Sequence, residues 1–397
     1  MAAQVHSEIL SEIGSEVRRE IGSGISSIPR PTPAAKPKKK LIRRTDHDRS
    51  QVIRRSFQAG FLVLNLWIGG IFYLWVRQFE PGGVATSMQR PAGVEGWLPI
   101  DGLMNLRYFG LTHHVPALHP AGMFLLIAFL AISFLFRKAF CSWLCPVGTI
   151  SEYLWRAGQR LFPHVVPLHL PRGLDIGFRA LKYLLLGFVV WAVASMTASD
   201  LAAFMNSPYG VIADVKMLNF FRHIGEAGAI VFGVLVVASL VIQNFWCRYL
   251  CPYGALLGIA ALVSPARIRR NPVTCIDCAK CVKACPSALP VDRLLTIKSA
   301  ECTGCLECVA VCPAKDALSL SLSLSLSSLN LPKIPALAPR PVKLPAWAVA
   351  AGIAALFFGV VGFAKTAGYW DSHVPRAIYQ QLVSTADEAR HPITGEN

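Results

Sequence analysis

Twelve cysteines lie in this chain of 397 residues, and all of them fall in four short motifs. Two motifs are C-x2-C-x2-C-x3-C runs, each followed by a proline. The first run contains Cys275, Cys278, Cys281 and Cys285, and the second contains Cys302, Cys305, Cys308 and Cys312. Thiolates at this spacing hold [4Fe–4S] clusters, which pass single electrons. The runs therefore predict two such clusters, and no cysteine remains for a disulfide or a core position.

The order of the cysteines also predicts which of them share a cluster. In paired runs of this kind, the fourth cysteine of each run binds the other cluster. The expected sets are Cys275, Cys278, Cys281 and Cys312 for one cluster and Cys302, Cys305, Cys308 and Cys285 for the other. A zinc site would use CxxC pairs in a tetrahedral group of four. That interpretation gives no role to the third cysteine of each run or to the prolines, so zinc is disfavoured.

The other four cysteines form two C-x3-C-P pairs. One pair is Cys141 and Cys145, and the other is Cys247 and Cys251. Cysteines four apart lie on one face of a helix, so the two pairs could pool their thiolates on one metal centre. That centre could be a further iron–sulfur cluster or a soft metal such as copper. Two other interpretations stay open: each pair cycles between dithiol and disulfide, or the four thiols are buried without a cofactor.

Histidines gather before the second apolar stretch of the chain. They are His113, His114 and His119, with Trp97 upstream. Imidazoles beside an apolar wall suggest a quinone or haem site, and the competing interpretation is a set of interfacial histidines that shape a loop. His373 and His391, near the end of the sequence, give a weaker signal of the same kind.

The composition indicates a membrane protein. Hydrophobic residues make up 53% of the chain and charged residues 16%, against about 25% charged in a typical soluble domain. A helix needs about 20 mostly apolar residues to cross a bilayer. Five stretches meet this test, the second once it is extended back to Val115: about 57–76, 121–136, 180–196, 227–245 and 347–363. We therefore expect a mainly α membrane protein with about five transmembrane helices and a small α+β ferredoxin-like domain with two clusters.

The distribution of basic residues predicts the orientation. The net charge is +16, and residues 1–56, 137–182 and 246–344 hold 31 of the 39 lysines and arginines. Basic residues favour the cytoplasmic side, so we expect a multi-pass protein of a bacterial inner membrane with the N-terminus and the clusters in the cytoplasm and the C-terminus in the periplasm. The asymmetry suits an anionic membrane surface and argues against nucleic-acid binding. The acidic first 35 residues have no apolar core of a cleavable signal peptide.

The chain divides into six expected segments. In order they are an N-terminal extension with a basic, proline-rich linker (1–56), a four-span membrane domain with both C-x3-C-P pairs (57–264), a double [4Fe–4S] ferredoxin domain (265–317), a low-complexity and proline-rich linker (318–346), a fifth transmembrane helix (347–363) and a periplasmic tail (364–397). The extension has an amphipathic pattern over 5–26, which predicts a docking helix or a partly disordered tail. A Leu/Ser alternation over 318–327 has the period of a strand or belongs to the linker.

The C-x3-C-P pairs belong to an internal repeat. In each copy an apolar stretch and an aromatic residue precede the pair, and a second helical stretch follows. Pro146 and Pro252 suit the first position of that second helix, and a residue before proline is biased out of helical geometry. We therefore expect each pair at a break between helices, near the cytoplasmic face.

Residues 55–315, with their spans, both C-x3-C-P pairs and the double run, resemble the membrane-bound polyferredoxins of the NapH and NosR type, which are associated with periplasmic nitrate and nitrous-oxide reductases. The stretch from His119 to Gly122, followed by Phe140 to Gly148, is similar to a [4Fe–4S] branch of that group. The resemblance implies cluster ligation by the eight cysteines of the runs and an essential role for the other four. A NosR-type protein carries a large outer flavin-binding domain, and this sequence shows no flavin-attachment motif.

These motifs and the resemblance predict a membrane-bound iron–sulfur protein that relays electrons between the quinone pool, or a cytoplasmic donor, and a partner reductase on the periplasmic side. A hydrocarbon core of about 30 Å is too thick for one unbridged electron hop, so quinol or a partner's cofactors would complete the path. The protein would then be an electron-transfer subunit. The alternative is a metal-reducing assembly factor for a copper-containing oxidase or reductase, and a third hypothesis is a redox sensor.

Overall fold

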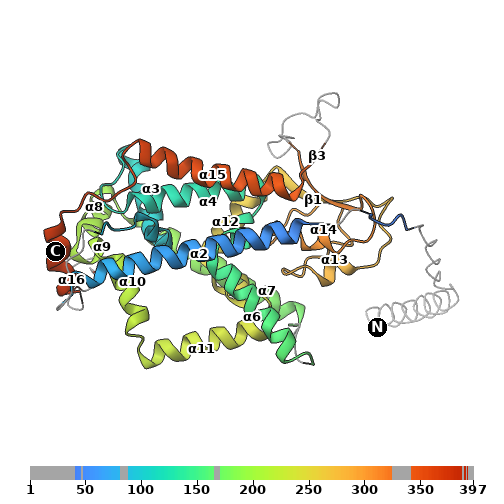
Figure 1. Ribbon diagram of the computed structural model, residues 1–397, viewed down its shortest axis with the longest axis horizontal. Coiled ribbons are helices and arrows are strands. Elements are labelled where there is room, and N and C mark those ends of the chain that lie inside the picture. Colours follow the sequence, from blue (N-terminus) through green and yellow to red (C-terminus); the bar gives the residue numbers. More distant parts are fainter. Residues whose placement is uncertain are drawn as a thin grey trace, which may run out of the picture. The chain divides into compact units, whose positions relative to one another are not determined.

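The computed structural model describes residues 41–45, 48–80, 88–164, 170–323, 341–386, 389 and 391. Most of these residues are helical, and a few short strands lie at one end, which we call the cluster end (Figure 1). The fold class predicted from the sequence is therefore confirmed. The expected helix over 5–26, the basic linker up to residue 40 and residues 324–340 of the later linker lie outside the described residues.

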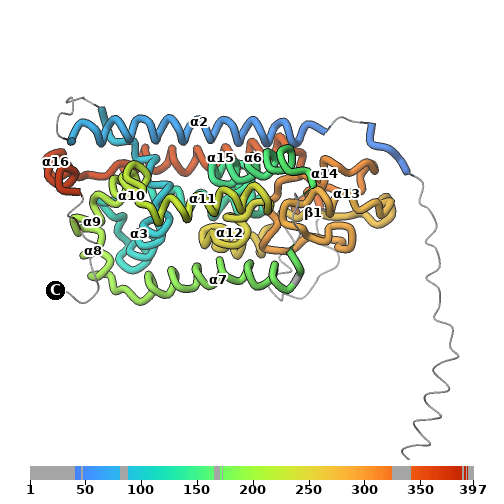
Figure 2. The backbone as a smooth tube through the Cα atoms, turned by 90° about the horizontal axis from the view of Figure 1, so that it is seen from below, coloured from blue at the N-terminus to red at the C-terminus, as the bar shows by residue number. Residues whose placement is uncertain are grey.

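Three described helices are long and apolar enough to cross a membrane. They are α2 (Ser50–Arg77), α7 (Arg172–Ser195) and α15 (Ala346–Thr366). Large apolar side chains on them are exposed, for example Trp67 on α2 at 68% and Trp191 on α7 at 67%. Exposed apolar surface of this extent marks contact with a membrane. Figure 2 shows the three helices running in the same direction, as spans of one bilayer would.

The other two expected spans take different forms. Helix α11 (Glu226–Val241) follows α10 (Ala213–Arg222) after a bend of 82°, and the two qualify only as one broken span. Helix α4 (Pro120–Phe136) has 17 residues, because it begins at a proline and ends where the backbone of Arg137 turns to a φ of 65°. Length and composition thus give three candidate spans, or four with the bent pair, where the sequence predicts about five.

Helix α4 lies at the centre of the larger core. Eleven of its 17 residues are buried, as expected for a helix that is apolar all round. Helices α3 (Pro99–Thr112), α12 (Pro252–Leu262) and α15 pack against it. Phe129 of α4 also stacks on Phe140 of the next helix, α5 (Ala139–Trp143), with ring centroids 4.0 Å apart. The first C-x3-C-P pair is therefore anchored in the core.

Short helices gather at the end opposite to the strands. They are η1 (Ala92–Trp97), α3, α8 (Ala198–Asn206), α9 (Pro208–Val211), α10 and α16 (Arg376–Ser384). A second core joins these helices to the last turns of α2, where the rings of Trp75 and Tyr379 lie 5.0 Å apart. Both ends of the membrane helices are thus held by packed segments.

The segment with the two runs contains a small antiparallel sheet and two one-turn helices. They are β1 (Ala266–Arg270), β2 (Leu318–Leu322) and β3 (Val342–Lys343), in that order in the sheet, with α13 (Lys280–Lys283) and α14 (Glu307–Ala310). In the register of the first two strands, Ala266 faces Leu322 and Arg270 faces Leu318. The first part of the Leu/Ser alternation is therefore a strand, as its period indicates, and the sheet continues past residue 317.

Both copies of the internal repeat end in a helix break. The first runs from α4 through α5 to α6 (Pro146–Leu161), and the second runs from α11 through a one-turn π-helix, η2 (Trp246–Leu250), to α12. Cys145 and Cys251 have extended backbone, with ψ of 118° and 105°, and the following proline opens α6 or α12. The predicted position of each pair at a helix break is confirmed.

Candidate metal centres

The two runs turn the chain in the same way. Ala279 and Leu306, which follow the second cysteine of each run, are left-handed with φ of 57° and 62°. Asp277 and Gly304, which precede that cysteine, also have φ of 57° and 62°. Left-handed residues between right-handed ones gather successive N–H groups into a concave site for negative charge, an arrangement found at many Fe–S sites. The backbone of each run therefore suits a bound cluster.

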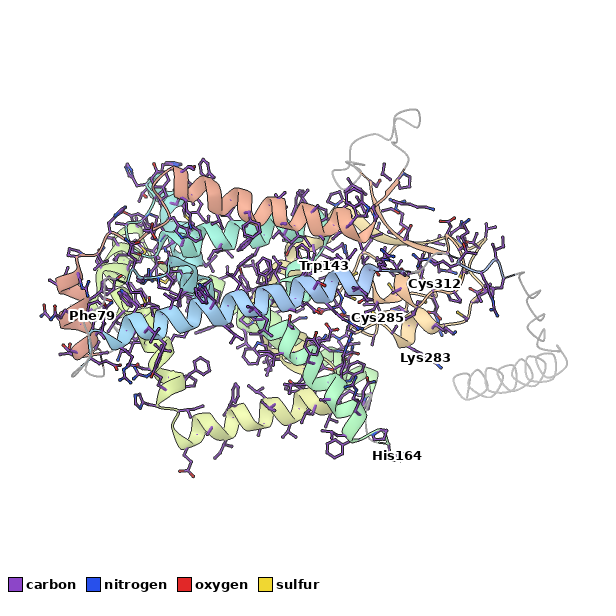
Figure 3. All side chains as sticks on the ribbon, in the orientation of Figure 1. Phe79, Trp143, His164, Lys283, Cys285 and Cys312 are labelled. Carbon is purple, nitrogen blue, oxygen red and sulfur yellow. The ribbon has the colours of Figure 1, made fainter. Side chains whose placement is uncertain are left out.

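Two small cavities are each lined by four cysteines. One is lined by Cys275, Cys278, Cys281 and Cys312, which we call the outer set. The other is lined by Cys285, Cys302, Cys305 and Cys308, which we call the inner set. These are the two sets that the spacing predicts, since the fourth cysteine of each run joins the first three of the other. Figure 3 labels Cys285 and Cys312, the two exchanged cysteines, at the cluster end.

The geometry suits a cluster better than a single ion. Among the described residues, no group of three or more His, Cys, Asp or Glu side chains lies close enough to hold one metal ion. In a [4Fe–4S] cluster each cysteine binds a different iron, so four sulfurs spread around a cavity meet that need. The backbone N–H of Leu289 also donates to Cys285 Sγ at 3.5 Å. Such hydrogen bonds to sulfur adjust the potential of a cluster.

The inner set is more buried than the outer set. Cys278 of the outer set is exposed, whereas all four cysteines of the inner set are buried or half-buried. Burial raises the pKa of Cys305 to about 12, and it holds the pKa of Cys308 well above the ordinary value. A buried thiolate is costly without a neighbouring cation, whereas coordination to a metal removes the proton outright. The inner thiols are therefore expected to ionise together with metal binding.

Each C-x3-C-P pair places its second cysteine at a helix N-terminus. Cys145 caps α6 and Cys251 caps α12, and the N–H of Gly254 donates to Cys251 Sγ at 3.2 Å. The free N–H groups of a helix start favour a thiolate. Gly148, two residues after Pro146, leaves room for this turn in the first pair, since a Cβ there would collide with the carbonyl oxygen of Cys141.

The four cysteines of the two pairs, which we call the quartet, lie close enough to interact electrostatically. Burial is the largest cause that raises the pKa of Cys247 well above its ordinary value, followed by the charges of Cys145, Cys251 and Cys141. Burial and then the charge of Cys141 raise the pKa of Cys145 to about 12. The fold thus brings the two repeats together at one place, which is what a shared metal centre requires.

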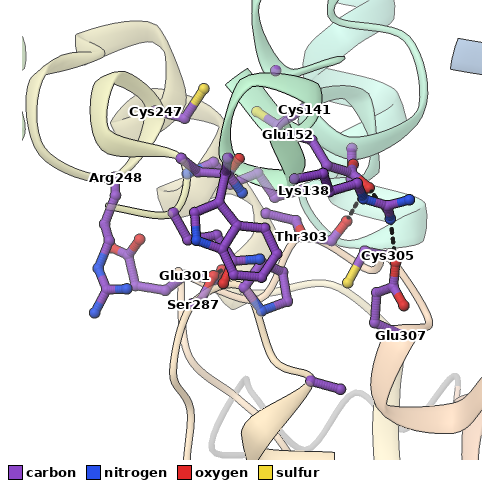
Figure 4. Close-up of a pocket in the computed structure, with 18 of the residues that line it drawn as sticks. Lys138, Cys141, Glu152, Cys247, Arg248, Ser287, Glu301, Thr303, Cys305 and Glu307 are labelled. Atoms are coloured by element: carbon purple, nitrogen blue, oxygen red, sulfur yellow. Dashed lines mark hydrogen bonds and ion pairs between the residues drawn. The ribbon is translucent and has the colours of Figure 1, made fainter. Parts of the chain in front are cut away.

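An open cavity separates the quartet from the inner set (Figure 4). Cys141 and Cys247 of the quartet line this cavity, and so does Cys305 of the inner set. The buried side chain of Lys138 lines it as well. Burial raises the pKa of Cys141 to about 11, and the positive charge of Lys138 acts in the opposite direction. The ammonium group therefore offsets part of the negative charge of the quartet.

Direct hydrogen bonds join the second run to the first C-x3-C-P pair. Ser142, inside that pair, donates its hydroxyl proton to the carbonyl oxygen of Thr303 at 2.7 Å. Trp143, which is fully buried, donates Nε1–H to the carbonyl oxygen of Gly304 at 3.2 Å. Thr303 and Gly304 separate the first two cysteines of the second run, so one loop of the inner set rests on α5.

Ion pairs hold the second run against the membrane helices. Arg54 of α2 is 1% exposed and contacts Glu152 of α6 and Glu307 of α14, each at 2.7 Å. Lys182 of α7 is fully buried and contacts Glu301 at 2.6 Å. Sequence reasoning missed these residues. The available signal was a basic residue beside or within an apolar stretch, which is costly unless it has a partner.

The structure separates the three candidate histidines. His119 is buried at the start of α4, with Nδ1 3.0 Å from Arg90 and 3.4 Å from Glu95. Burial opposes its charged form, but Glu95 raises the pKa of His119 to about 9. His113 and His114 are exposed at the end of α3. His119 therefore belongs to a buried ion network, and the three histidines do not form the joint quinone or haem site suggested by the sequence.

The weaker candidates near these histidines have local partners. Trp97 donates Nε1–H to Asn65 at 3.1 Å, and the backbone N–H of His373 donates to Ala117 at 3.4 Å. The ring of His391 lies 4.8 Å from that of Tyr209. The contacts of Trp97 and His391 account for these two side chains as packing, whereas His373 is exposed and its contact is made by the backbone.

Comparisons with known proteins agree with the cysteine geometry. The family described as "4Fe-4S binding domain" matches residues 118–163 and 224–271, which contain the two C-x3-C-P pairs. The family described as "4Fe-4S dicluster domain" matches residues 266–320, which contain both runs. No solved structure matches the chain.

Relatives extend the match over most of the chain. The putative electron transport protein YccM of Escherichia coli (strain K12) is 46% identical over 338 residues, which cover 85% of this chain and 91% of that protein. Protein NirI of Paracoccus denitrificans is 32% identical over 53% of this chain and 31% of its own length. The ferredoxin-type protein NapH of Haemophilus influenzae is 26% identical over 59% of this chain and 74% of its own length. The chain therefore belongs to the membrane polyferredoxins of the NapH and NosR type, a family of iron–sulfur electron-transfer proteins that includes YccM.

Proposed function

We propose that this protein is an electron relay with three metal centres: one [4Fe–4S] cluster on the outer set, one on the inner set and a third centre on the quartet. The observation that carries the proposal is the arrangement of twelve cysteines in three groups of four. Two groups surround one cavity each, and the third faces the inner set across another cavity. When bound, the clusters would store and pass single electrons.

The chain's own residues supply the conditions that such centres need. Left-handed turns in both runs gather N–H groups around the cluster sites, and the cysteines of the inner set and the quartet are all buried or half-buried. The contacts from Ser142 and Trp143 fix the loop of the second run on α5. Fixed placement of this kind keeps the distance between neighbouring centres constant, which electron transfer requires.

An iron–sulfur cluster is the best candidate for the third centre. The two stretches that carry the C-x3-C-P pairs match a 4Fe-4S binding domain, and the pairs come from helix starts that favour thiolates. Four thiolates and no imidazole or thioether ligand also suit iron–sulfur chemistry better than a copper site of mixed ligands.

We further propose that the outer and inner sets lie on the cytoplasmic side of a bacterial inner membrane and that the C-terminal end lies in the periplasm. The concentration of lysine and arginine in the segments at the cluster end supports this orientation. The quinone pool or a soluble donor on one side and a partner reductase on the other would complete the path. About 30 Å of hydrocarbon separates the two surfaces, so diffusing quinol or a partner's cofactors must bridge it.

Iron analysis and EPR spectroscopy of anaerobically purified protein test the number of centres. Three [4Fe–4S] clusters predict about twelve iron atoms per chain. The quadruple Cys→Ser variant of the quartet should hold about eight and lose one signal from the dithionite-reduced spectrum. A Cys→Ser variant of all four cysteines of the outer set serves as the matched control, because it should lose a different signal.

Each result separates one part of the proposal. Unchanged iron and an unchanged spectrum in the quartet variant would exclude a third iron–sulfur centre while leaving the two clusters in place. An iron-free, colourless wild-type protein would exclude the relay altogether.

A further inference from the structure

The two runs carry opposite charges at equivalent positions. Residues 280 and 307 both follow the left-handed residue between the second and third cysteine. In the second run this residue is Glu307, whose carboxylate contacts Arg54 at 2.7 Å and Arg156 at 3.2 Å. In the first run it is Lys280, which is exposed. Glu307 thus attaches the second run to the membrane helices, whereas Lys280, at the equivalent position of the first run, is a cation exposed to solvent.

Exposed cations surround the outer set. Lys280 and Lys283 belong to the first run, and Lys315 follows Cys312 by three residues; all three lysines are exposed. Arg44 lies beside the same set, because its backbone N–H donates to the carbonyl oxygen of Pro313 at 3.0 Å, and its guanidinium is paired with Asp48 at 2.7 Å.

The exposed acids near the outer set already have basic partners. Asp277 lies 3.3 Å from Arg270, and Asp316 lies 2.6 Å from Lys343. The face around the outer set is therefore net positive. A net positive face attracts a negative partner and raises its rate of association.

Apolar side chains accompany these charges. Val273, two residues before the first cysteine of the outer set, is 79% exposed, and Ile42 is 63% exposed. The carbonyl oxygen of Ile42 accepts a hydrogen bond from the N–H of Lys315 at 3.0 Å, so it lies on the same side. Apolar contacts inside a charged rim are typical of protein interfaces, and weak redox encounters use small ones.

The order of the centres identifies the partner as an electron carrier. The quartet and the inner set face each other across one cavity, whereas Cys278 of the outer set reaches the surface. A nucleic acid or an anionic lipid would match the charge but would bring no electron to this cysteine. A soluble protein with an acidic surface and a one-electron redox group matches both features.

We propose that the face formed by Lys280, Lys283 and Lys315 with Val273 is the docking site of a soluble, acidic one-electron carrier protein. The inference rests on the proposed function, because it assumes a cluster on the outer set. In the exchange the reduced carrier would lose one electron and an oxidised cluster held by the outer set would gain it. The reverse exchange uses the same contact, and neither direction forms a bond or moves a proton.

Binding and rapid-mixing measurements on the full-length protein in detergent test the docking site. The probe is an acidic [2Fe–2S] ferredoxin, photoreduced for the kinetic experiment. The triple variant Lys280→Glu, Lys283→Glu, Lys315→Glu should slow its second-order reduction of this protein by about 10- to 100-fold at low ionic strength. The Kd for the oxidised ferredoxin should rise by a similar factor, and this readout does not depend on electron flow.

Three comparisons make the result specific. Lys298→Glu is the matched control, because this exposed lysine lies in the same segment but beside Ser299, whose carbonyl oxygen accepts a hydrogen bond from Arg137 of the membrane domain. It should leave both readouts unchanged. A basic cytochrome c, used as an acceptor from the reduced protein, should react faster with the triple variant. The triple Lys→Gln variant should show the ferredoxin effect in weaker form.

The possible outcomes distinguish loss of the docking site from loss of the cluster on the outer set. Unchanged ferredoxin kinetics and Kd in the triple variant, or an equal loss in Lys298→Glu, would overturn the docking site. Binding of DNA or anionic vesicles that the triple variant loses while ferredoxin binding persists would also overturn it. The EPR spectrum after reduction with dithionite should be identical in wild type and variant. Loss of iron from the wild type itself would count against the proposed function, and the Kd comparison would still judge the docking site.

Discussion

The two cysteine runs have the same spacing and the same left-handed turns, yet their surroundings differ. The second run is held by Arg54, by Lys182 and by hydrogen bonds from α5, and its cysteines are buried or half-buried. The first run exposes Cys278 and carries exposed lysines between its cysteines. The ligands of a duplicated motif thus define what both copies bind, and the residues between the ligands decide what each copy contacts.

The largest expected effect comes from breaking the anchor of the second run. Arg54→Met removes the buried cation between Glu152 and Glu307 and leaves Arg156 as the shared partner of the two carboxylates. We expect a loss of about 3–5 kcal/mol in the free energy of unfolding, measured by denaturant unfolding in detergent, with faster proteolysis of the cluster segment. Lys280→Met in the first run should change it by less than about 0.5 kcal/mol. Equal losses in the two variants would show that the runs are not differently anchored.

A smaller effect is expected from the buried indole under the second run. Trp143→Phe leaves the carbonyl oxygen of Gly304 without its N–H donor, which costs about 1–3 kcal/mol. Iron should pass to a chelator faster than in the wild type, because the loop of the inner set is loosened. Tyr249, at the equivalent position of the second C-x3-C-P pair, donates its hydroxyl proton to Asp175 at 2.7 Å. Tyr249→Phe should therefore lower stability without faster iron release. Equal rates of iron release in the Trp143 and Tyr249 variants would contradict the role of Trp143 in holding the loop of the inner set.

The end of the molecule opposite to the clusters should respond to pH and not to iron. Glu95 raises the pKa of His119 to about 9, above its ordinary value of 6.5. The stabilisation from the charged imidazole is therefore complete below pH 6.5 and is lost as the pH rises through 9. We expect a loss of about 2–3 kcal/mol over that range, measured as a falling Tm. His119→Gln should flatten this dependence, and a variant that keeps the wild-type slope would exclude His119 as its source.

The smallest effect is expected from a single hydroxyl group at the contact of α5 with the second run. Ser142→Ala removes the hydrogen bond to Thr303 and should cost about 0.5–1.5 kcal/mol in the free energy of unfolding. Ser195→Ala is the matched control, because its hydroxyl proton is donated within its own helix, to Ala192. Denaturant unfolding of the two variants compares them directly. A larger loss in Ser195→Ala would show that the hydrogen bond from Ser142 to Thr303 adds little to the attachment of the second run.

The sequence was sufficient where spacing alone determines geometry. The positions of Pro146 and Pro252 predicted both helix breaks, whereas the Leu/Ser alternation left strand and linker open and the structure shows a strand, β2, over its first part. The contact of Arg54 with Glu307 could not be predicted from the sequence, because the two residues are 253 positions apart and meet only through the tertiary fold. The histidines failed as a group for a related reason: proximity in sequence did not prevent α3 and α4 from carrying His113 and His119 into different environments.

The long interval between Arg54 and Glu307 also bears on how the protein is made. A ribosome that adds about 5–20 residues per second needs about 13–50 s to travel from the first of these residues to the second. During that interval Arg54 has been synthesised but its partner Glu307 has not. The contact with Glu307 therefore forms only after three of the four inner cysteines, Cys285, Cys302 and Cys305, have been synthesised.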